Sequence, residues 1–153
     1  HGVALDYEQI LANNFSKLIR EGDAVVDVGA HSGRHTRVFA KLVGPSGRIC
    51  AIEPLEYFAT MLSTEFGGSE SVRVHNVAAS NFIGKSNFTV AEGTPEESGL
   101  RRKPYIYPER AAPKEIEVSV VTLDSLLSDW NRVDYLKLDI EGAELDCLEG
   151  AAE

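Results

Sequence analysis

Short apolar runs alternate with helical patterns through the first half of the chain. Residues 24–28 are almost continuously apolar, which is expected of a strand buried on both faces. A helical pattern at residues 38–43 leads to a second apolar run at residues 48–52, and another at residues 58–66 leads to a third run at residues 72–77. Repeated strand–helix–strand units require parallel strands joined by right-handed crossovers. The chain is therefore predicted to form an open α/β sheet.

The second half of the chain follows a different pattern. Residues 87–90 and 116–120 alternate apolar and polar side chains with a period of two, which is typical of antiparallel strands with one solvated face. A further strand is predicted at residues 133–139, followed by a helix at residues 141–149. We expect a mostly parallel sheet in the strand order 3-2-1-4, numbered along the chain, with the antiparallel hairpin inserted before the fourth strand.

A long irregular segment separates the two strands of the predicted hairpin. Residues 91–113 are rich in Pro, Gly, Glu and Arg, and a loop of this length inside a compact domain is usually functional or disordered. The segment contains the basic run 101–103 and two aromatic residues, Tyr105 and Tyr107. Such side chains bind anions and stack on ring faces. The segment is interpreted either as a lid over a bound acceptor or as a disordered linker.

The charge balance disfavours several classes of partner. The 153 residues carry 24 acidic and 15 basic side chains, a formal charge of −9, and an acidic chain is a poor partner for nucleic acid because phosphate binding needs clustered Lys and Arg. No apolar run approaches the ~18 residues of a membrane-spanning helix. Two cysteines, Cys50 and Cys147, are too few for a disulfide framework, so a reducing, cytoplasmic location is expected. The oligomeric state is not indicated.

A glycine loop at residues 27–33 closes the first predicted strand and opens a helix. Gly29 permits a sharp turn and lets a ligand touch the backbone, and Gly33 lets the helix begin close to the strand. Glu53 ends the second predicted strand, where a carboxylate can accept hydrogen bonds from both hydroxyls of a ribose. Loop and acid together predict a nucleoside-type ligand at the carboxyl ends of the strands.

Two classes of nucleoside ligand compete for this loop. A dinucleotide site needs the spacing G-x-G-x-x-G to cradle a pyrophosphate, whereas this loop reads G-x-x-x-G, with Asp27 two residues before the first glycine. An acid at this place repels phosphate and suits a ligand with a cationic end. S-adenosylmethionine has a sulfonium, an amino group and no phosphate, so the sign of the charge favours it over NAD. The alternative is that Asp27 is a strand-end acid and the glycines only shape turns.

Four segments together carry a resemblance to a known family. Residues 26–33, 52–54 and 76–79 and the run K-L-D-I-E-G-A-E at residues 137–144 resemble the FkbM-type family of class I S-adenosylmethionine-dependent methyltransferases, in order along most of the chain. The resemblance implies a Rossmann-like sheet, S-adenosylmethionine as the methyl donor, and O-methyl transfer onto a sugar or natural-product hydroxyl. The implied cofactor-binding residues are Asp27, Gly29, Ala30, His31, Gly33, Glu53, Pro54, Asn76, Val77, Ala78 and Asp139.

Two features depart from the pattern of this family. Relatives commonly carry Asn where His31 stands. Class I folds also continue into further strands after the helix predicted at residues 141–149. We therefore expect a single domain over residues 1–153 that is truncated at its C-terminus, with the C-terminal strands missing and the edge of the fourth strand open or covered by another chain.

Two carboxylates at the end of the fourth predicted strand are the catalytic candidates. Methyl transfer from a sulfonium mainly needs alignment, but a hydroxyl acceptor must still lose its proton. Asp139 and Glu141 lie beside the expected cofactor crevice, and Glu144 is expected on the same helix face as Glu141. Asp139 or Glu141 is predicted to act on the acceptor. A divalent cation held by the three carboxylates and a purely structural acidic helix start are the alternatives, and no metal site is assigned.

Three functions remain open from the sequence. The leading one is a methyltransferase that uses S-adenosylmethionine and methylates a small-molecule or saccharide hydroxyl, with no nucleic-acid or membrane partner. The second is a dinucleotide-binding oxidoreductase of the NAD type. The third is a non-catalytic or truncated domain that binds a nucleoside without turnover.

Overall fold

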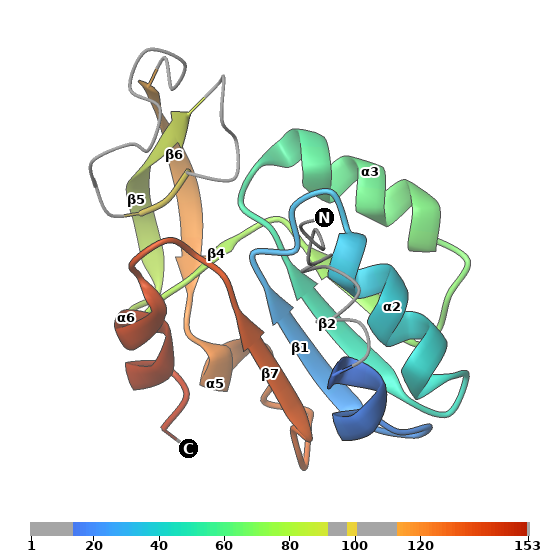
Figure 1. Ribbon diagram of the computed structural model, residues 1–153. Helices are drawn as coiled ribbons and strands as arrows, with labels where there is room; N and C mark the ends of the chain where they lie inside the picture. Colours follow the sequence, from blue (N-terminus) through green and yellow to red (C-terminus); the bar gives the residue numbers. More distant parts are fainter. Residues whose placement is uncertain (1–13, 92–97, 101–112, 153) are drawn as a thin grey trace, which may run out of the picture.

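A parallel sheet lies between two layers of helices (Figure 1). The computed structural model describes residues 14–91, 98–100 and 113–152. The order of the parallel sheet is β3-β2-β1-β7, which confirms the predicted order 3-2-1-4. Its strands are β1 (Ala24–Val28), β2 (Arg48–Ile52), β3 (Val72–His75) and β7 (Tyr135–Leu138). The helices are α2 (Arg34–Val43) and α3 (Glu56–Phe66) on one face and α5 (Leu123–Leu126) and α6 (Glu144–Glu149) on the other.

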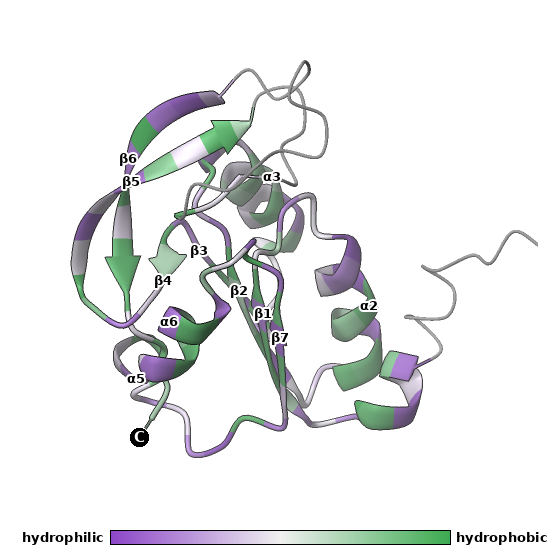
Figure 2. Ribbon diagram, turned by 60° about the vertical axis from the view of Figure 1, so that its left-hand side comes forward, coloured by the Kyte–Doolittle hydropathy of each residue, from purple (hydrophilic) through white to green (hydrophobic). Residues whose placement is uncertain are grey.

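The central strands are buried on both faces, as their continuous apolar sequence predicts. All five residues of β1 are buried. Alternate residues point to opposite faces of a sheet, so Val25 packs with Phe39 of α2 in one core, while Val26 packs with Leu123 and Cys147 in the other. Figure 2 shows the hydrophobic central strands between α2 on one side and α5 and α6 on the other.

The predicted hairpin forms a second, smaller sheet. Strands β5 (Gly84–Ala91) and β6 (Pro113–Val121) pair antiparallel with Phe88 opposite Ile116, which confirms the inserted hairpin. The short strand β4 (Ala78–Ala79) joins this sheet in parallel with β6. The sequence did not predict β4, because two residues carry no periodic pattern.

The long segment at residues 91–113 is described at residues 98–100. There the backbone of Gly99 exchanges two hydrogen bonds with Thr89 of β5, at 2.9 and 3.0 Å. The basic run 101–103 and Tyr105 and Tyr107 lie outside the described residues, so their role stays a prediction.

The last helix begins later than its sequence pattern predicts. Helix α6 begins at Glu144, because Glu141 and Gly142 have left-handed backbone angles, with φ of 55° and 97°. The expectation that Glu141 and Glu144 share a helix face is therefore wrong. Cys50 and Cys147 are both buried free thiols. In the described part of the chain, no helix is long and apolar enough to cross a membrane.

Candidate functional site

A cleft opens where β1, β2 and β7 reach their carboxyl ends. Its volume is about 510 Å³, and Phe88 of β5 with Ser98 and Leu100 of the insert forms one wall. The structure places most of the predicted site residues on this cleft. The predicted residues that line it are Gly29, Ala30, His31, Glu53, Pro54, Ala78, Asp139 and Glu141. Asp27, Gly33, Asn76 and Val77 are not among the lining residues.

The bend at Gly29 is dictated by the end of β7. Gly29 has a φ of 77°, and a Cβ at this position would collide with the backbone carbonyl of Asp139. The expected reason for the glycine was the approach of a ligand, whereas the structure adds the close approach of a neighbouring strand. Consequently the glycine loop and the Asp139 backbone are in direct contact.

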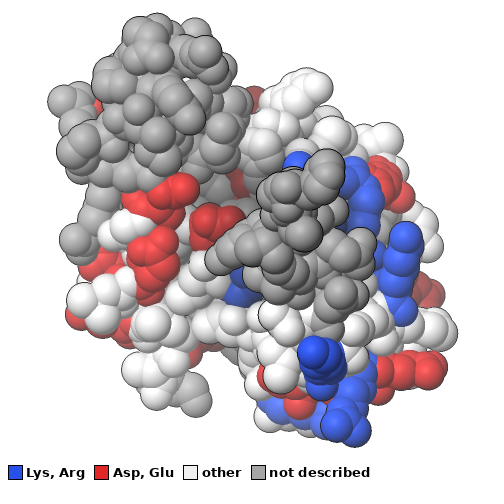
Figure 3. Space-filling view, in the orientation of Figure 1, with Lys and Arg blue, Asp and Glu red and all other residues white. Residues whose placement is uncertain are grey.

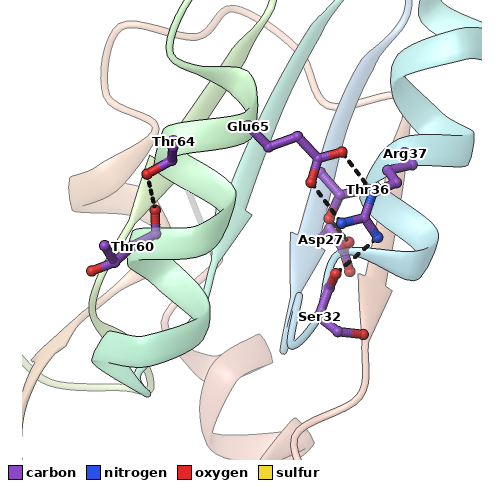
Figure 4. Close-up of polar contacts among 7 residues, drawn as sticks. All are labelled: Asp27, Ser32, Thr36, Arg37, Thr60, Thr64 and Glu65. Carbon is purple, nitrogen blue, oxygen red and sulfur yellow. Dashed lines mark hydrogen bonds and ion pairs between the residues drawn. The ribbon is translucent and has the colours of Figure 1, made fainter.

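Gly33 serves the packing of two helices. A Cβ on Gly33 would collide with Leu62 of α3, so the required close approach is to α3 rather than to the strand. Arg37 of α2 reinforces this junction through paired bonds of 2.6 Å to both carboxylate oxygens of Glu65 on α3. The same guanidinium donates to the Ser32 carbonyl at 2.9 Å, which ties the glycine loop to both helices (Figure 4).

Glu53 presents a buried carboxylate to the cleft. It is 4% exposed, and its two oxygens accept hydrogen bonds from the backbone N–H groups of His31 at 2.7 Å and Leu55 at 2.9 Å. Burial raises the pKa of Glu53, and these two hydrogen bonds act in the opposite direction. Each carboxylate oxygen has two lone pairs, so each can still accept one more hydrogen bond.

His31 occupies a strained backbone position in the glycine loop. Its φ is 48°, a region that Asn, Asp and His tolerate better than other non-glycine residues. The imidazole lies against the ring of Phe58, with 3.9 Å between the ring centroids. The structure therefore gives His31 a packing role in the cleft wall.

Asp27 lies beneath the glycine loop and not on the cleft. Its side chain is 0% exposed and accepts hydrogen bonds from Thr36 Oγ1 at 2.7 Å and from Lys137 Nζ at 3.1 Å. The charge of Asp27 is thus compensated by Lys137. The negative charge that faces the cleft comes instead from the carboxylates of Glu53, Asp139 and Glu141.

Asn76 holds the segment that follows β2 and borders the cleft. Its side-chain N–H groups donate to the carbonyl oxygens of Glu53 at 3.0 Å and Pro54 at 2.9 Å. Val77 packs against the core on the α5 and α6 side of the sheet. Asn76 therefore positions the turn that carries Glu53, and the cofactor contact expected for Asn76 and Val77 stays a prediction.

The two catalytic candidates stand on the turn between β7 and α6. The side chain of Asp139 is 62% exposed, and its Oδ2 lies 3.7 Å from Lys137 Nζ. Glu141 lines the cleft from its left-handed position. Among the described residues, no group of three or more His, Cys, Asp and Glu side chains is placed to hold a metal ion.

The sequence interpretation missed several residues that line the cleft. These are Arg34 and His35 at the start of α2, Phe88, Ser98 and Leu100 from the hairpin region, and Lys137 of β7. Lys137 could have been found, because parallel pairing of two strands that end at one sheet edge brings it beside Asp27. The positions of Phe88, Ser98 and Leu100 depend on how the hairpin folds back over the sheet, whereas Arg34 and His35 follow the glycine loop directly in α2.

The charges around the cleft are divided between its two sides. Figure 3 shows Asp and Glu side chains gathered over the part of this face that α6 occupies in Figure 1, whereas Lys and Arg lie mainly toward α2. Asp139 and Glu141 lie on the turn that leads from β7 into α6.

Several known proteins are similar to this chain. The methyltransferase FkbM domain family matches residues 27–153. A solved methyltransferase FkbM from Methylobacillus flagellatus has 16% sequence identity and a TM-score of 0.56, covering 92% of this chain and 36% of that chain. An S-adenosylmethionine-dependent O-methyltransferase from Thermotoga maritima has 29% identity and a TM-score of 0.40, over 50% of this chain and 29% of the other.

A curated relative matches over a shorter stretch. The protein-L-isoaspartate O-methyltransferase of Ignicoccus hospitalis is 46% identical over 41 residues, which are 27% of this chain and 19% of that protein. This chain therefore spans about a fifth of the curated relative and just over a third of the FkbM structure.

The fold and the site together identify the class of domain to which this chain belongs. A parallel sheet in this order, with a glycine loop after β1 and a carboxylate after β2 facing one cleft, is a Rossmann-like nucleoside-binding domain. Because the family matches most of its length, the chain belongs to the methyltransferase FkbM domain family. This confirms the resemblance read from the sequence.

Proposed function

We propose that this domain binds S-adenosylmethionine and directs transfer of its methyl group to a hydroxyl of a small molecule or saccharide. The observation that carries the proposal is the buried carboxylate of Glu53, which faces the cleft from the end of β2. Both of its oxygens are already fixed by backbone N–H groups and retain acceptor capacity, which suits the two hydroxyls of a ribose.

The hydrogen bonding of the loop argues against a dinucleotide. A pyrophosphate needs backbone N–H groups directed toward it. In this loop the N–H groups are largely engaged within the protein: Gly29 and Ala30 donate to Ile52 O at 3.0 and 3.1 Å, His31 donates to Glu53, and Gly33 donates to Ala30 O at 2.8 Å. A donor without phosphate fits this loop, and S-adenosylmethionine is such a donor.

The residues that follow β7 fit an acceptor that must lose a proton. When bound, S-adenosylmethionine would supply a methyl group on a sulfonium: the acceptor oxygen would bond to the methyl carbon, the C–S bond would break, and its electron pair would stay on the sulfur of S-adenosylhomocysteine. In this proposal the carboxylate of Asp139 takes the hydroxyl proton, because it is exposed at the cleft, and Glu141 orients the acceptor.

The remaining wall supports an uncharged acceptor. Phe88 and Leu100 bring apolar surface to the cleft, close to the acidic end formed by Asp139 and Glu141. Apolar ring faces and carboxylate acceptors are the groups that bind a polyol or sugar. An acidic rim also disfavours a phosphorylated acceptor, because like charges repel.

Calorimetric titration tests the donor assignment directly. The protein should bind S-adenosylhomocysteine, the product of methyl donation, and should show no heat of binding with NAD. The variant Glu53→Ala should lose most of this affinity, whereas Glu117→Ala, an exposed acid on β6 paired with Lys85, should keep it. Binding of NAD in place of S-adenosylhomocysteine would favour the oxidoreductase alternative and end this proposal.

A further inference from the structure

Lys137 enters the cleft wall from directly beneath the glycine loop. In the parallel register of β1 and β7 it lies opposite Asp27, so both side chains project from the same face of the sheet. The Lys137 side chain is 11% exposed, and part of it lines the cleft. It therefore sits at the boundary between the buried charge of Asp27 and the ligand space.

Three oxygen atoms from different parts of the site surround the ammonium group of Lys137. Its Nζ lies 3.1 Å from Asp27 Oδ1, 3.3 Å from the carbonyl oxygen of Gly29 and 3.7 Å from Asp139 Oδ2. An ammonium has three N–H donors and can therefore address several acceptors at once. The Gly29 contact is made to the bend that begins the donor loop.

Neutralising Asp27 does not require the contact with Gly29. Asp27 is 0% exposed and also accepts a hydrogen bond from Thr36 of α2, so its carboxylate is held from two sides. A lysine that only compensated this charge could point away from the loop. Instead it donates to the carbonyl of Gly29, whose backbone angle is left-handed and whose N–H is fixed to Ile52.

We propose that Lys137 is a positioning residue of the donor site, which ties the bend at Gly29 to the buried carboxylate of Asp27. The inference rests on the proposed function, because it assigns to Lys137 the shape of the loop that receives the donor. The bond to Gly29 fixes the carbonyl side of the bend, and the bonds to Ile52 fix its N–H side. Because the loop is already ordered in this way, donor binding costs less conformational entropy.

The test separates loop positioning from charge compensation. Lys137→Met alone leaves a buried, unpaired carboxylate and should destabilise the fold strongly. The double variant Asp27→Asn/Lys137→Met removes both charges, and Thr36 can still donate to the asparagine oxygen. Lys85→Met is the matched control, because Lys85 is an exposed lysine paired with Glu117 on the hairpin.

Two measurements are made on each variant. The double variant should recover a Tm within a few degrees of the wild type. Its Gly29 and Ala30 amides should nevertheless exchange hydrogen about tenfold faster than those of Lys85→Met, and its affinity for S-adenosylhomocysteine should be about tenfold weaker, because one hydrogen bond to a charged group is lost. Wild-type exchange and affinity in a stable double variant would overturn the proposal, as would a double variant that does not fold.

The two proposals fail in different ways. If the wild-type protein does not bind S-adenosylhomocysteine, the proposed function fails, while faster amide exchange in the double variant would still support the tether at Gly29. If the wild type binds and the double variant matches Lys85→Met in both measurements, only the role of Lys137 is overturned.

Discussion

The backbone N–H of His31 donates to Glu53 Oε2 at 2.7 Å, which links the glycine loop after β1 to the carboxylate after β2. Leu55 holds the second carboxylate oxygen from the start of α3, at 2.9 Å. The side chain that is expected to recognise a ribose is therefore fixed before any ligand arrives. Its surroundings also make its protonation relevant to both stability and binding.

Because Glu53 is buried, the free energy of unfolding and the affinity for S-adenosylhomocysteine should change with pH in opposite directions. Burial raises the pKa of Glu53 above its ordinary value of 4.5, so the folded state holds the proton more tightly than the unfolded state. Its contribution to the free energy of unfolding should therefore fall as pH rises from 4.5 through the raised pKa. Affinity for S-adenosylhomocysteine should rise over the same window, because the ionised carboxylate accepts on both oxygens.

The difference between wild type and Glu53→Gln isolates this group. Urea unfolding and calorimetry from about pH 4 to about pH 7 measure the two quantities, and titration of other acids cancels in the difference between the two proteins. A difference that does not change with pH would contradict the assignment.

Substitution of Gly29 should disturb both the fold and the cleft. Gly29→Ala should lower the free energy of unfolding by about 3 kcal/mol, because the new Cβ collides with the Asp139 carbonyl and the backbone is left-handed. Gly142→Ala should cost about 1 kcal/mol, because that glycine is left-handed but has no atom within 4 Å of the added Cβ. Chemical denaturation checks both values, and equal losses would show that the close approach to β7 is not limiting.

Substitution of Asp139 should slow turnover and leave the affinity for the donor site's ligand almost unchanged. Asp139→Asn should slow methyl transfer about 100-fold, since the amide cannot accept the hydroxyl proton. Its affinity for S-adenosylhomocysteine should change little, because its carboxylate is 62% exposed and the proposed ribose contact is made by Glu53. Transfer of labelled methyl to a panel of monosaccharides and small alcohols measures the rate. Glu149→Gln on α6 is the control, because Glu149 is bonded to Asn81 away from the cleft. Unchanged turnover in Asp139→Asn would remove this residue from the chemistry.

Substitution of Glu141 by Asn should raise stability and lower activity. Its φ of 55° is unfavourable for a long side chain, so Glu141→Asn should raise the free energy of unfolding by about 1 kcal/mol while it lowers methyl transfer. Glu141→Gln keeps the side-chain length and the backbone preference and removes only the charge. Comparison of the two variants by thermal unfolding and by methyl transfer separates strain from chemistry. A less stable Glu141→Asn would show that the backbone at this turn is not strained.

The parallel sheet and its glycine loop could be predicted because their causes are local. Buried strands read as continuous apolar runs, and the glycine spacing marks the loop that follows β1. The position of Glu53 at the end of β2 was likewise predictable, since parallel strands bring their carboxyl ends to one edge. The start of α6 was misplaced, because the left-handed turn at Glu141 and Gly142 leaves no mark in the hydrophobic pattern.

The sequence by itself therefore determined the order of the parallel strands, the hairpin insert, the family resemblance and most of the residues around the cleft. Only the tertiary structure decided which charges face the ligand. Pairing of β1 with β7 buries Asp27 against Lys137 and leaves the cleft to Glu53, Asp139 and Glu141. The physical reason is burial: the Asp27 side chain is 0% exposed and bonded to Thr36 and Lys137, whereas that of Asp139 is 62% exposed, and Lys137 lies 110 residues from Asp27 along the chain.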